Sequence, residues 1–351
     1  MMQSNNNKRL TGINAGDIIV LRDGDGDTWD LAWADDDYLY TPSNDTSGFG
    51  GQPRRNVAFN KLSGDAPNTL NGITVNNMDE YGEHGDKLDD NCTWKTSGCY
   101  CVDGVLYLAI GRHCYGHESG DPHKRQTVKN TSIIKSEDYG VTWIRSAQEN
   151  YKNPHFTNEF VTPYFIYYGK NAQAPDVDNA KKYIYAVSNN GFWDSGDFYI
   201  LGRVKREKLG DLNPSDWQYY LGGDGLQDSS WGAIAADAMH IIDNPRKCGE
   251  TGATYIPDIG RYVLVGWYYT GNGRDNTEET WFTYYEAPHP WGPWTAVCEE
   301  KNNPEGWYCP RILSKWQQSD SEAVKTVMVT AGDWQNQDYY RMSLKNIEIL
   351  A

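Results

Sequence analysis

The amino-acid sequence predicts an all-β protein, and more precisely a five-bladed β-propeller. Short runs that alternate apolar and polar residues fill the chain, bounded by Gly, Asp, Asn and Pro, as is typical of strands joined by turns. Three pairs of runs meet at tight turns, which predicts hairpins around Asp35 to Asp37, Asp103-Gly104 and Asp258 to Gly260. A propeller suits this pattern because radial repetition leaves few exposed sheet edges.

The runs group into successive units of about four strands each, the size of a propeller blade. Each unit opens with a run suited to line a central channel and closes with a strand rich in Trp or Tyr. The five units span, in order, about Gly26 to Val75, Lys95 to Arg145, about Phe160 to Leu221, Gly249 to Glu299, and Trp307 to Leu350. We expect residues 1–16 to be an N-terminal tail and residues 17–351 to form a single catalytic propeller domain.

The charge balance excludes two classes of partner. The 351 residues hold 32 Lys and Arg against 48 Asp and Glu, a formal net charge of -16. This balance would repel nucleic acid phosphates and anionic lipid surfaces. No apolar run approaches the roughly 18 residues that a membrane helix needs. We therefore expect neither a nucleic-acid partner nor a membrane partner.

The cysteines and glycosylation triplets bear on the compartment. Seven cysteines leave at least one thiol unpaired within the chain. Cys99 and Cys101 would share one face of a strand, which suits core packing, whereas Cys298 and Cys309 flank a polar loop and could close it as a disulfide. Three Asn-x-Ser/Thr triplets are compatible with secretion. We expect an extracellular protein, although the opening residues MMQSNNNKRL lack the apolar stretch of a signal peptide.

The segment from Ser136 to Trp143, SEDYGVTW, matches the motif S-x-D-x-G-x-T-W at every fixed position. It resembles the Asp-boxes of sialidases and other carbohydrate-active propellers. In such a turn Gly140 permits a positive φ, the Asp138 carboxylate binds turn amides, and the Trp packs under the blade. We expect this motif to be architectural and to carry no catalysis.

Carboxylates and aromatic residues are densest between Asp23 and Asp45, which makes this segment the first candidate site. If the hairpin turns at Asp36, Asp27 and Asp45 lie directly opposite each other, with Cβ atoms about 4.5–5.5 Å apart. Two like charges this close raise one pKa and leave the other low. Glycoside hydrolysis requires such a division between an acid and a nucleophile or base. The alternative is that either carboxylate only caps a turn.

The sequence offers only weak support for two candidate metal sites. The spacing of Asp23, Asp25 and Asp27 fits a calcium loop poorly, because Thr28 stands where that loop needs Gly. A second group, His113, His117 and His123, has spacings without strand or helix periodicity. We expect no metal at the site and no cofactor, with a structural calcium as the remaining alternative.

Several motifs together resemble a known family. They are GDTW-x3-WADD-x2-LYT-x3-D (Gly26 to Asp45), CVDGVLYL, the PD-x-GRY hairpin and APHPWGPWTAV. The chain is similar from about residue 17 onward to a bacterial and fungal propeller family, once classed as of unknown function, that includes endo-D-arabinanases of glycoside hydrolase family 183. The resemblance implies that Asp27 and Asp45 are the catalytic pair. Because SND stands where a Gly-Asp is common, and the insert RHCYGHESGDPHKRQ is unusual, the substrate is not carried over.

Five-bladed glycosidases of the arabinanase and xylosidase kind also resemble this layout. That likeness implies acids at the inner-strand starts of blades one, three and four. The matching acids are Asp27 or Asp30, Glu159 and Glu250. Glu250 would suit a general acid at the channel mouth. The alternative for either glutamate is a solvated loop carboxylate.

Histidines support a rival chemistry. A polysaccharide lyase removes a proton next to a uronate carboxylate, with His or Tyr as base and a cation that neutralises the carboxylate. His113 and His240 could supply the base, while Arg112 and Arg246 could bind the carboxylate. Each lone His could equally be structural. In the hydrolase reading, Arg112 and His113 would orient substrate hydroxyls or a carboxylate.

Aromatic rings could form platforms for sugars, because they accept the apolar face of a pyranose or furanose. The candidates are Trp29, Trp33, Trp193, Trp231, Trp267 and Tyr268, of which Trp193 lies in a Gly/Asn-rich loop. The alternative for each is the propeller core. The sequence thus predicts a glycoside hydrolase that cleaves a plant or microbial polysaccharide, including arabinofuranosyl-containing ones. A uronate lyase and a non-catalytic glycan-binding propeller are the alternatives.

Overall fold

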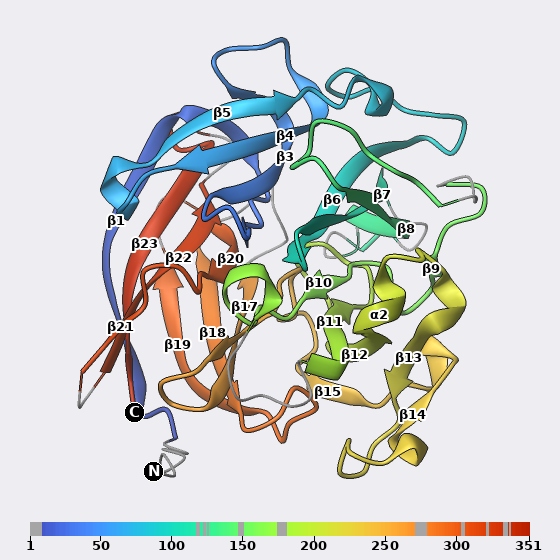
Figure 1. Cartoon of the computed structure of the whole chain (residues 1–351), viewed down its shortest axis with the longest axis vertical. Helices are drawn as coiled ribbons and strands as arrows, with labels where there is room; N and C mark the ends of the chain where they lie inside the picture. Colours follow the sequence, from blue (N-terminus) through green and yellow to red (C-terminus); the bar gives the residue numbers. More distant parts are fainter. Residues whose placement is uncertain are drawn as a thin grey trace.

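The computed structural model describes residues 9–116, 120–121, 124, 126–146, 151–173, 181–270, 279–302, 306–320, 323–332, 336 and 338–351. Sheets follow one another around a centre, and the first and last strands lie side by side (Figure 1). The expected all-β propeller is confirmed. The number of blades stays a prediction, because hydrogen bonding among the described strands gives four sheets and the largest joins the first and last expected units.

The largest sheet holds strands from both ends of the chain. Its order is β20 (Tyr308–Ile312), β22 (Ala323–Ala331), β23 (Arg341–Leu350), β1 (Gly12–Asp27), β3 (Leu39–Phe49), β4 (Arg55–Ser63) and β5 (Asn71–Asn76). Two short strands attach to it, β2 (Ala32–Trp33) on β3 and β21 (Gln318–Ser319) on β22.

The other three sheets follow in sequence. One contains β6 (Cys92–Val102), β7 (Val105–Tyr115), β8 (Gln126–Ser136) and β9 (Phe156–Thr157). The next contains β10 (Tyr164–Phe165), β11 (Tyr183–Asn189), β12 (Phe198–Lys205), β13 (Trp217–Tyr220) and β14 (Trp231–Gly232), with β15 (His240–Asp243) on β12. The last contains β16 (Ala253–Ile256), β17 (Arg261–Tyr269), β18 (Thr280–Ala287) and β19 (Thr295–Asn302).

The helical elements whose bounds are described are each a single turn. The α-helix α2 spans Arg206–Leu209. The 3₁₀ turns are η1 (Pro67–Thr69), η2 (Asp79–Tyr81), η4 (Lys170–Ala172), η5 (Pro214–Asp216), η6 (Asp228–Ser230) and η7 (Ala235–Asp237). Within the described part of the chain, no helix is long and apolar enough to cross a membrane.

Strand β1 closes the ring and corrects one expected boundary. Gly12 to Ala15 pair with Leu350 to Ile347 of β23, so this part of the expected tail is already strand. The end of β1, from Gly24 to Asp27, pairs with β3. Pairing the two chain ends in this way removes sheet edges that would otherwise lie open.

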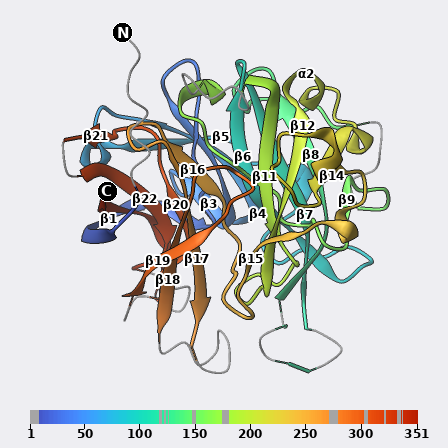
Figure 2. The same cartoon turned by 90° about the horizontal axis from the view of Figure 1, so that it is seen from below.

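The hairpins expected at tight turns are all present. Ala32 pairs with Tyr40 around the first turn, Val102 pairs with Val105 around the second, and Ile256 pairs with Arg261 around the third. Figure 2 shows β6 and β11 near the middle of the molecule in the turned view.

The turn from Ser136 to Trp143 follows directly after β8. Gly140 has a φ of 90°, and the Asp138 carboxylate accepts a hydrogen bond from the Thr142 amide at 2.8 Å. Trp143 packs edge-on against Phe59 of β4, with ring centroids 4.8 Å apart. These contacts fix the turn, and none of its residues lines the pocket described below.

One cysteine expectation is wrong. Cys298 and Cys309 are both free thiols, so the polar loop between β19 and β20 is not closed by a disulfide. Cys92 and Cys114 instead form a disulfide between directly opposite positions of β6 and β7. Cross-strand partners lie close enough for such a bond, whereas loop length alone did not bring the expected pair together.

Candidate functional site

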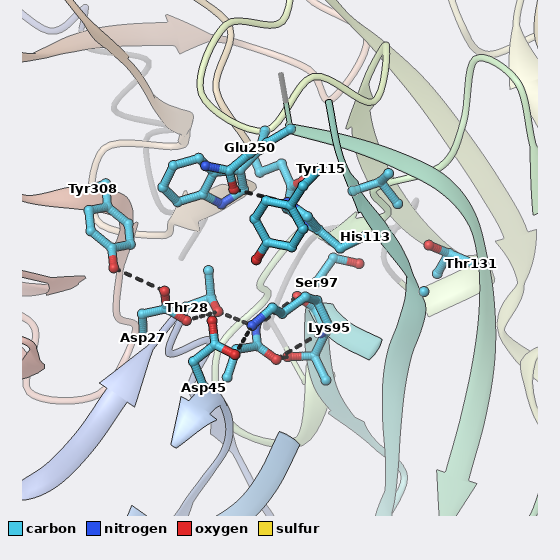
Figure 3. Close-up of a pocket in the computed structure, with 16 residues that line it drawn as sticks. Asp27, Thr28, Asp45, Lys95, Ser97, His113, Tyr115, Thr131, Glu250 and Tyr308 are labelled. Atoms are coloured by element: carbon cyan, nitrogen blue, oxygen red, sulfur yellow. Dashed lines mark hydrogen bonds and ion pairs between the residues drawn. The ribbon is translucent and has the colours of Figure 1, made fainter. Parts of the chain in front are cut away.

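A pocket opens where the largest sheet meets β6, β7 and β8 (Figure 3). Polar side chains dominate its wall. The lining residues are Asp27, Thr28, Asn44, Asp45, Lys95, Thr96, Ser97, Gly111, His113, Tyr115, Gln126, Val128, Thr131, Trp193, Glu250 and Tyr308. Three carboxyl groups from distant parts of the sequence therefore face one space.

Asp27 and Asp45 both line this pocket, but their pairing differs from the expected register. Asp27 lies opposite Asn44, and the ladder shifts between Asp25 and Asp27. Asp45 has a φ of 46°, in the left-handed region that Asp tolerates better than most residues. This local irregularity, rather than a regular cross-strand pair, turns the Asp45 carboxylate into the pocket beside Asp27.

Asp45 is held as an anion. Its Oδ1 forms an ion pair with Lys95 Nζ, and His84 Nδ1 lies 3.0 Å from the same oxygen. Burial alone would raise the pKa of the Asp45 carboxyl, but the Lys95 charge and the His84 and Lys95 hydrogen bonds outweigh it and lower that pKa. Asp45 therefore remains ionised well into acidic solution.

The pKa of the Asp27 carboxyl is shifted in the opposite direction. Thr28 Oγ1 and the Tyr308 hydroxyl each donate a hydrogen bond to it at 3.0 Å, and Tyr340 donates another. Burial raises the pKa of the Asp27 carboxyl; Lys95 opposes this, whereas the negative charge of Asp45 adds to it, and the pKa is raised overall. Two neighbouring carboxyls of the same residue type thus have pKa values moved in opposite directions.

Lys95 is the principal site residue that the sequence interpretation missed. It lies on β6, in CTWKTSGCYCV, and is the only residue of that strand that is not fully buried. Burial alone would lower the pKa of its ammonium, but Asp45, Tyr115 and Asp27 raise it, so Lys95 is a cation. A lone charge within a strand of otherwise uncharged, buried residues was the signal that could have identified it.

Glu250 reaches the pocket from the loop before β16. The Glu250 backbone N–H donates to the Trp193 carbonyl at 2.9 Å, and the Glu250 backbone carbonyl accepts a hydrogen bond from Trp267 Nε1 at 2.9 Å. Burial, aided by the charges of Asp27 and Asp194, raises the pKa of the Glu250 carboxyl to about 8, while a hydrogen bond from Tyr164 opposes the shift. Glu250 is therefore a neutral acid at neutral pH.

His113 also lines the pocket, as expected. Its Nε2 lies 3.0 Å from Gln126 Oε1, and its ring lies 5.2 Å from that of Tyr115. Figure 3 shows the Tyr115 ring between Glu250 and the two aspartates. His117 and His123 of the alternative metal site lie outside the described residues.

Three residues expected at the site instead hold the fold together. Trp29 is 2% exposed and packs against Phe49. Asp30 is buried, pairs with Arg311 and accepts a hydrogen bond from Tyr167. Arg112 is fully buried and pairs with Asp90 at 2.8 Å. None lines the pocket, because each meets its partners inside or between sheets.

The other predicted residues divide in the same way. Trp193 lines the pocket, but the residue is only 6% exposed, and its ring packs against that of Trp267 with centroids 5.0 Å apart. His240 stacks on Phe198 at the surface, and Arg246 pairs with Asp121. Neither lines the pocket, and neither does Glu159, which lies in a turn between β9 and β10. Only His113 of the expected lyase residues is therefore in the pocket.

Comparison with known proteins identifies the family and the fold. The family model described as a domain of unknown function, DUF4185, matches residues 3–345, so the chain belongs to the DUF4185 family. No curated protein matches the chain.

Two solved structures resemble the chain along most of its length. A protein of Bacteroides ovatus ATCC 8483, described as a candidate hydrolase, has a TM-score of 0.58 at 14% identity, over 92% of this chain and 85% of that one. A structure named RS223 β-xylosidase has a TM-score of 0.50 at 14% identity, over 95% of this chain and 94% of that one. At these identities the likeness supports the fold alone.

Proposed function

We propose that this member of the DUF4185 family is a glycoside hydrolase that cleaves a polysaccharide with Asp27 and Asp45. The observation that carries the proposal is the pair of opposite pKa shifts in one pocket, Asp27 raised and Asp45 lowered. Glycoside hydrolysis needs one carboxylic acid and one carboxylate at the scissile bond. The likeness to a β-xylosidase fold and the Gly26 to Asp45 motif support the same reading.

In the proposed mechanism, Asp27 donates its proton to the glycosidic oxygen as the bond to the anomeric carbon breaks. Asp45, kept ionised by Lys95, attacks that carbon or removes a proton from an attacking water. Positive charge that develops on the sugar is stabilised by the negative Asp45. Where Asp45 attacks, water then cleaves the ester bond between Asp45 and the sugar, and Asp27 takes the proton of that water. Where Asp45 activates water, it releases the acquired proton to the solvent and Asp27 takes one up.

The substrate is proposed to be uncharged at the cleaved sugar. Lys95 is the only Lys or Arg among the residues that line the described pocket, and it is already paired with Asp45. A uronate carboxylate would enter beside three acidic groups without a free cation to neutralise it. Arabinofuranosyl-containing polysaccharides are the first substrates to try, because the family that the Gly26 to Asp45 motif resembles includes endo-D-arabinanases. The departures from that motif are the reason to test other polysaccharides beside them. The Cys92–Cys114 disulfide supports the proposal of an extracellular location.

A polysaccharide panel tests this function. Arabinan, arabinogalactan, gum arabic and uronate-rich polymers are incubated with the wild type, Asp27→Asn and Asp45→Asn, and both reducing ends and the ultraviolet absorbance of unsaturated products are measured. We expect reducing ends without absorbance, and a loss of about 10²- to 10⁴-fold in each variant. Asp237→Asn, an exposed site on η7 outside the pocket, is the matched control.

Two results would overturn the hydrolase. Absorbance that survives Asp27→Asn would place the chemistry at His113 as a lyase. Binding of a polysaccharide without either product would identify a glycan-binding propeller.

A further inference from the structure

Glu250 is a pocket carboxyl that the Asp27 and Asp45 mechanism does not use. We propose that Glu250 positions the substrate by donating a hydrogen bond from its carboxyl group to a sugar oxygen. The inference rests on the proposed function, since it names a substrate-binding group of the same pocket. It also changes the role expected for Glu250 from the sequence, which was that of a general acid.

The first argument is an unsatisfied atom at the pocket wall. Glu250 is 3% exposed, and its Oε1 has no hydrogen-bond partner among the described residues. Its Oε2 accepts only a long bond of 3.4 Å from the Tyr164 hydroxyl. Buried polar atoms are normally hydrogen-bonded. A buried oxygen without a partner at a pocket wall indicates that a ligand or water supplies the missing hydrogen bond.

The second argument is that the backbone that carries Glu250 is held in place by its loop. Gly249, immediately before it, touches Trp267 so closely that a Cβ there would lie 2.5 Å from the indole ring. The backbone bonds to Trp193 and Trp267 hold the residue on both sides. A group held this firmly loses little freedom when it binds a sugar, which favours a positioning role.

The third argument is the charge around the carboxyl. The titratable groups that act on it are Asp27, Asp194 and Tyr164, and its own charge acts on Tyr199 and Cys309. Arg311, the cation near Tyr164, is paired with Asp30. Burial among acids keeps the carboxyl protonated, consistent with its raised pKa of about 8. A protonated carboxyl carries an O–H donor, and the hydroxyl, ring and glycosidic oxygens of a sugar are acceptors.

Glu250→Gln and Glu250→Ala separate the positioning role from that of a proton donor and from a structural role. Gln keeps a hydrogen-bond donor of nearly the same shape, and Ala removes it. We expect Glu250→Gln to keep kcat and KM within about threefold, and Glu250→Ala to raise KM about three- to tenfold, the range for one net hydrogen bond. Wild-type KM should rise above about pH 8, where Glu250 ionises, and KM of Glu250→Gln should not. Glu207→Gln on α2 is the matched control for charge removal.

A binding measurement keeps this test independent of the hydrolase proposal. Each Glu250 variant is also made in the Asp27→Asn background and run on native gels that contain the panel polysaccharides. Retardation that weakens in Glu250→Ala and persists in Glu250→Gln supports the inference, even where the wild type hydrolyses none of the polysaccharides. That absence of hydrolysis would overturn only the proposed function.

Two outcomes would overturn the inference. Loss of polysaccharide hydrolysis in Glu250→Gln, with cleavage retained for aryl glycosides that carry an activated leaving group, would make Glu250 the proton donor. Unchanged KM, gel retardation and pH profile in Glu250→Ala would make it a structural residue.

Discussion

Lys95 on β6 and Asp45 on β3 form an ion pair that joins two sheets at the edge of the pocket. The two side chains are 11% and 20% exposed, so water screens their attraction only in part. The pair gives Asp45 its low pKa, and the same Lys95 charge partly offsets the effect of burial on Asp27. One cation thus lowers the pKa of both carboxyls, and it outweighs burial only at Asp45.

Removal of that cation should change both activity and stability. In Lys95→Met we expect the pKa of Asp45 to rise, so the acidic limb of the kcat profile should move to higher pH. The unpaired carboxylate should cost about 3–5 kcal/mol of unfolding free energy at neutral pH. Denaturant unfolding and a kcat profile between pH 3 and pH 7 check this. Lys325→Met, which removes a 59% exposed lysine, is the control and should change stability by about 1 kcal/mol or less.

Lys95→Arg gives the opposite test, because it keeps the charge. An acidic limb that stays at its wild-type position in both Lys95 variants would show that Asp45 does not depend on this ion pair. In the wild type, the stability from the lowered pKa of Asp45 is present above the unfolded value of 3.8 and is lost as pH falls toward the folded one.

Glu250 should make the protein less stable as pH rises. Its pKa is about 8 in the folded state against 4.5 for the free group, so the folded state holds a proton that the unfolded state has lost in this window. The unfolding free energy should therefore fall by up to about 1.4 kcal/mol per pH unit between these values. Thermal unfolding of the wild type and Glu250→Gln at pH 5 and pH 8 measures the difference. Equal changes with pH in the two proteins would show that Glu250 does not hold its proton.

The disulfide between Cys92 and Cys114 should stabilise the part of the pocket built on β6 and β7. It closes a sequence separation of 22 residues, for which chain entropy predicts about 3 kcal/mol. We expect a reductant to lower Tm and activity of the wild type together, because Lys95 and His113 lie on these strands. A Cys92→Ala/Cys114→Ala variant is the control and should start at the lower Tm. A reductant that lowers its Tm equally would mean that the disulfide is not the cause.

Arg112 should be a stability residue rather than a substrate ligand. Arg112→Met would leave Asp90 without its partner and should cost about 3 kcal/mol, while KM of the folded enzyme stays unchanged. Thermal unfolding and steady-state kinetics on the best substrate of the panel separate the two effects. A large rise in KM at unchanged Tm would return Arg112 to the substrate site.

Local patterns predicted the strands and hairpins because these depend on neighbours in the chain. The turns at Asp35 to Asp37 and Asp103-Gly104 were predicted from turn residues between alternating runs. The exact register was not, because the ladder shift beside Asp27 depends on how β1 meets both β3 and β23. The sequence could therefore place Asp27 and Asp45 in one region. It could not show that Asp27 pairs with Asn44, or that Asp45 adopts a left-handed backbone conformation.

The sequence by itself determined the fold class and the presence of carboxylates in the first hairpin, since alternation, turn residues and local acid density are properties of short segments. Only the tertiary structure decided which charged groups meet. Lys95 and Glu250 lie 50 and 205 positions from Asp45, and they reach it because sheets from distant segments face one pocket. The same packing removed Trp29, Asp30 and Arg112 from the site, since burial against partners from other strands gives each a structural role.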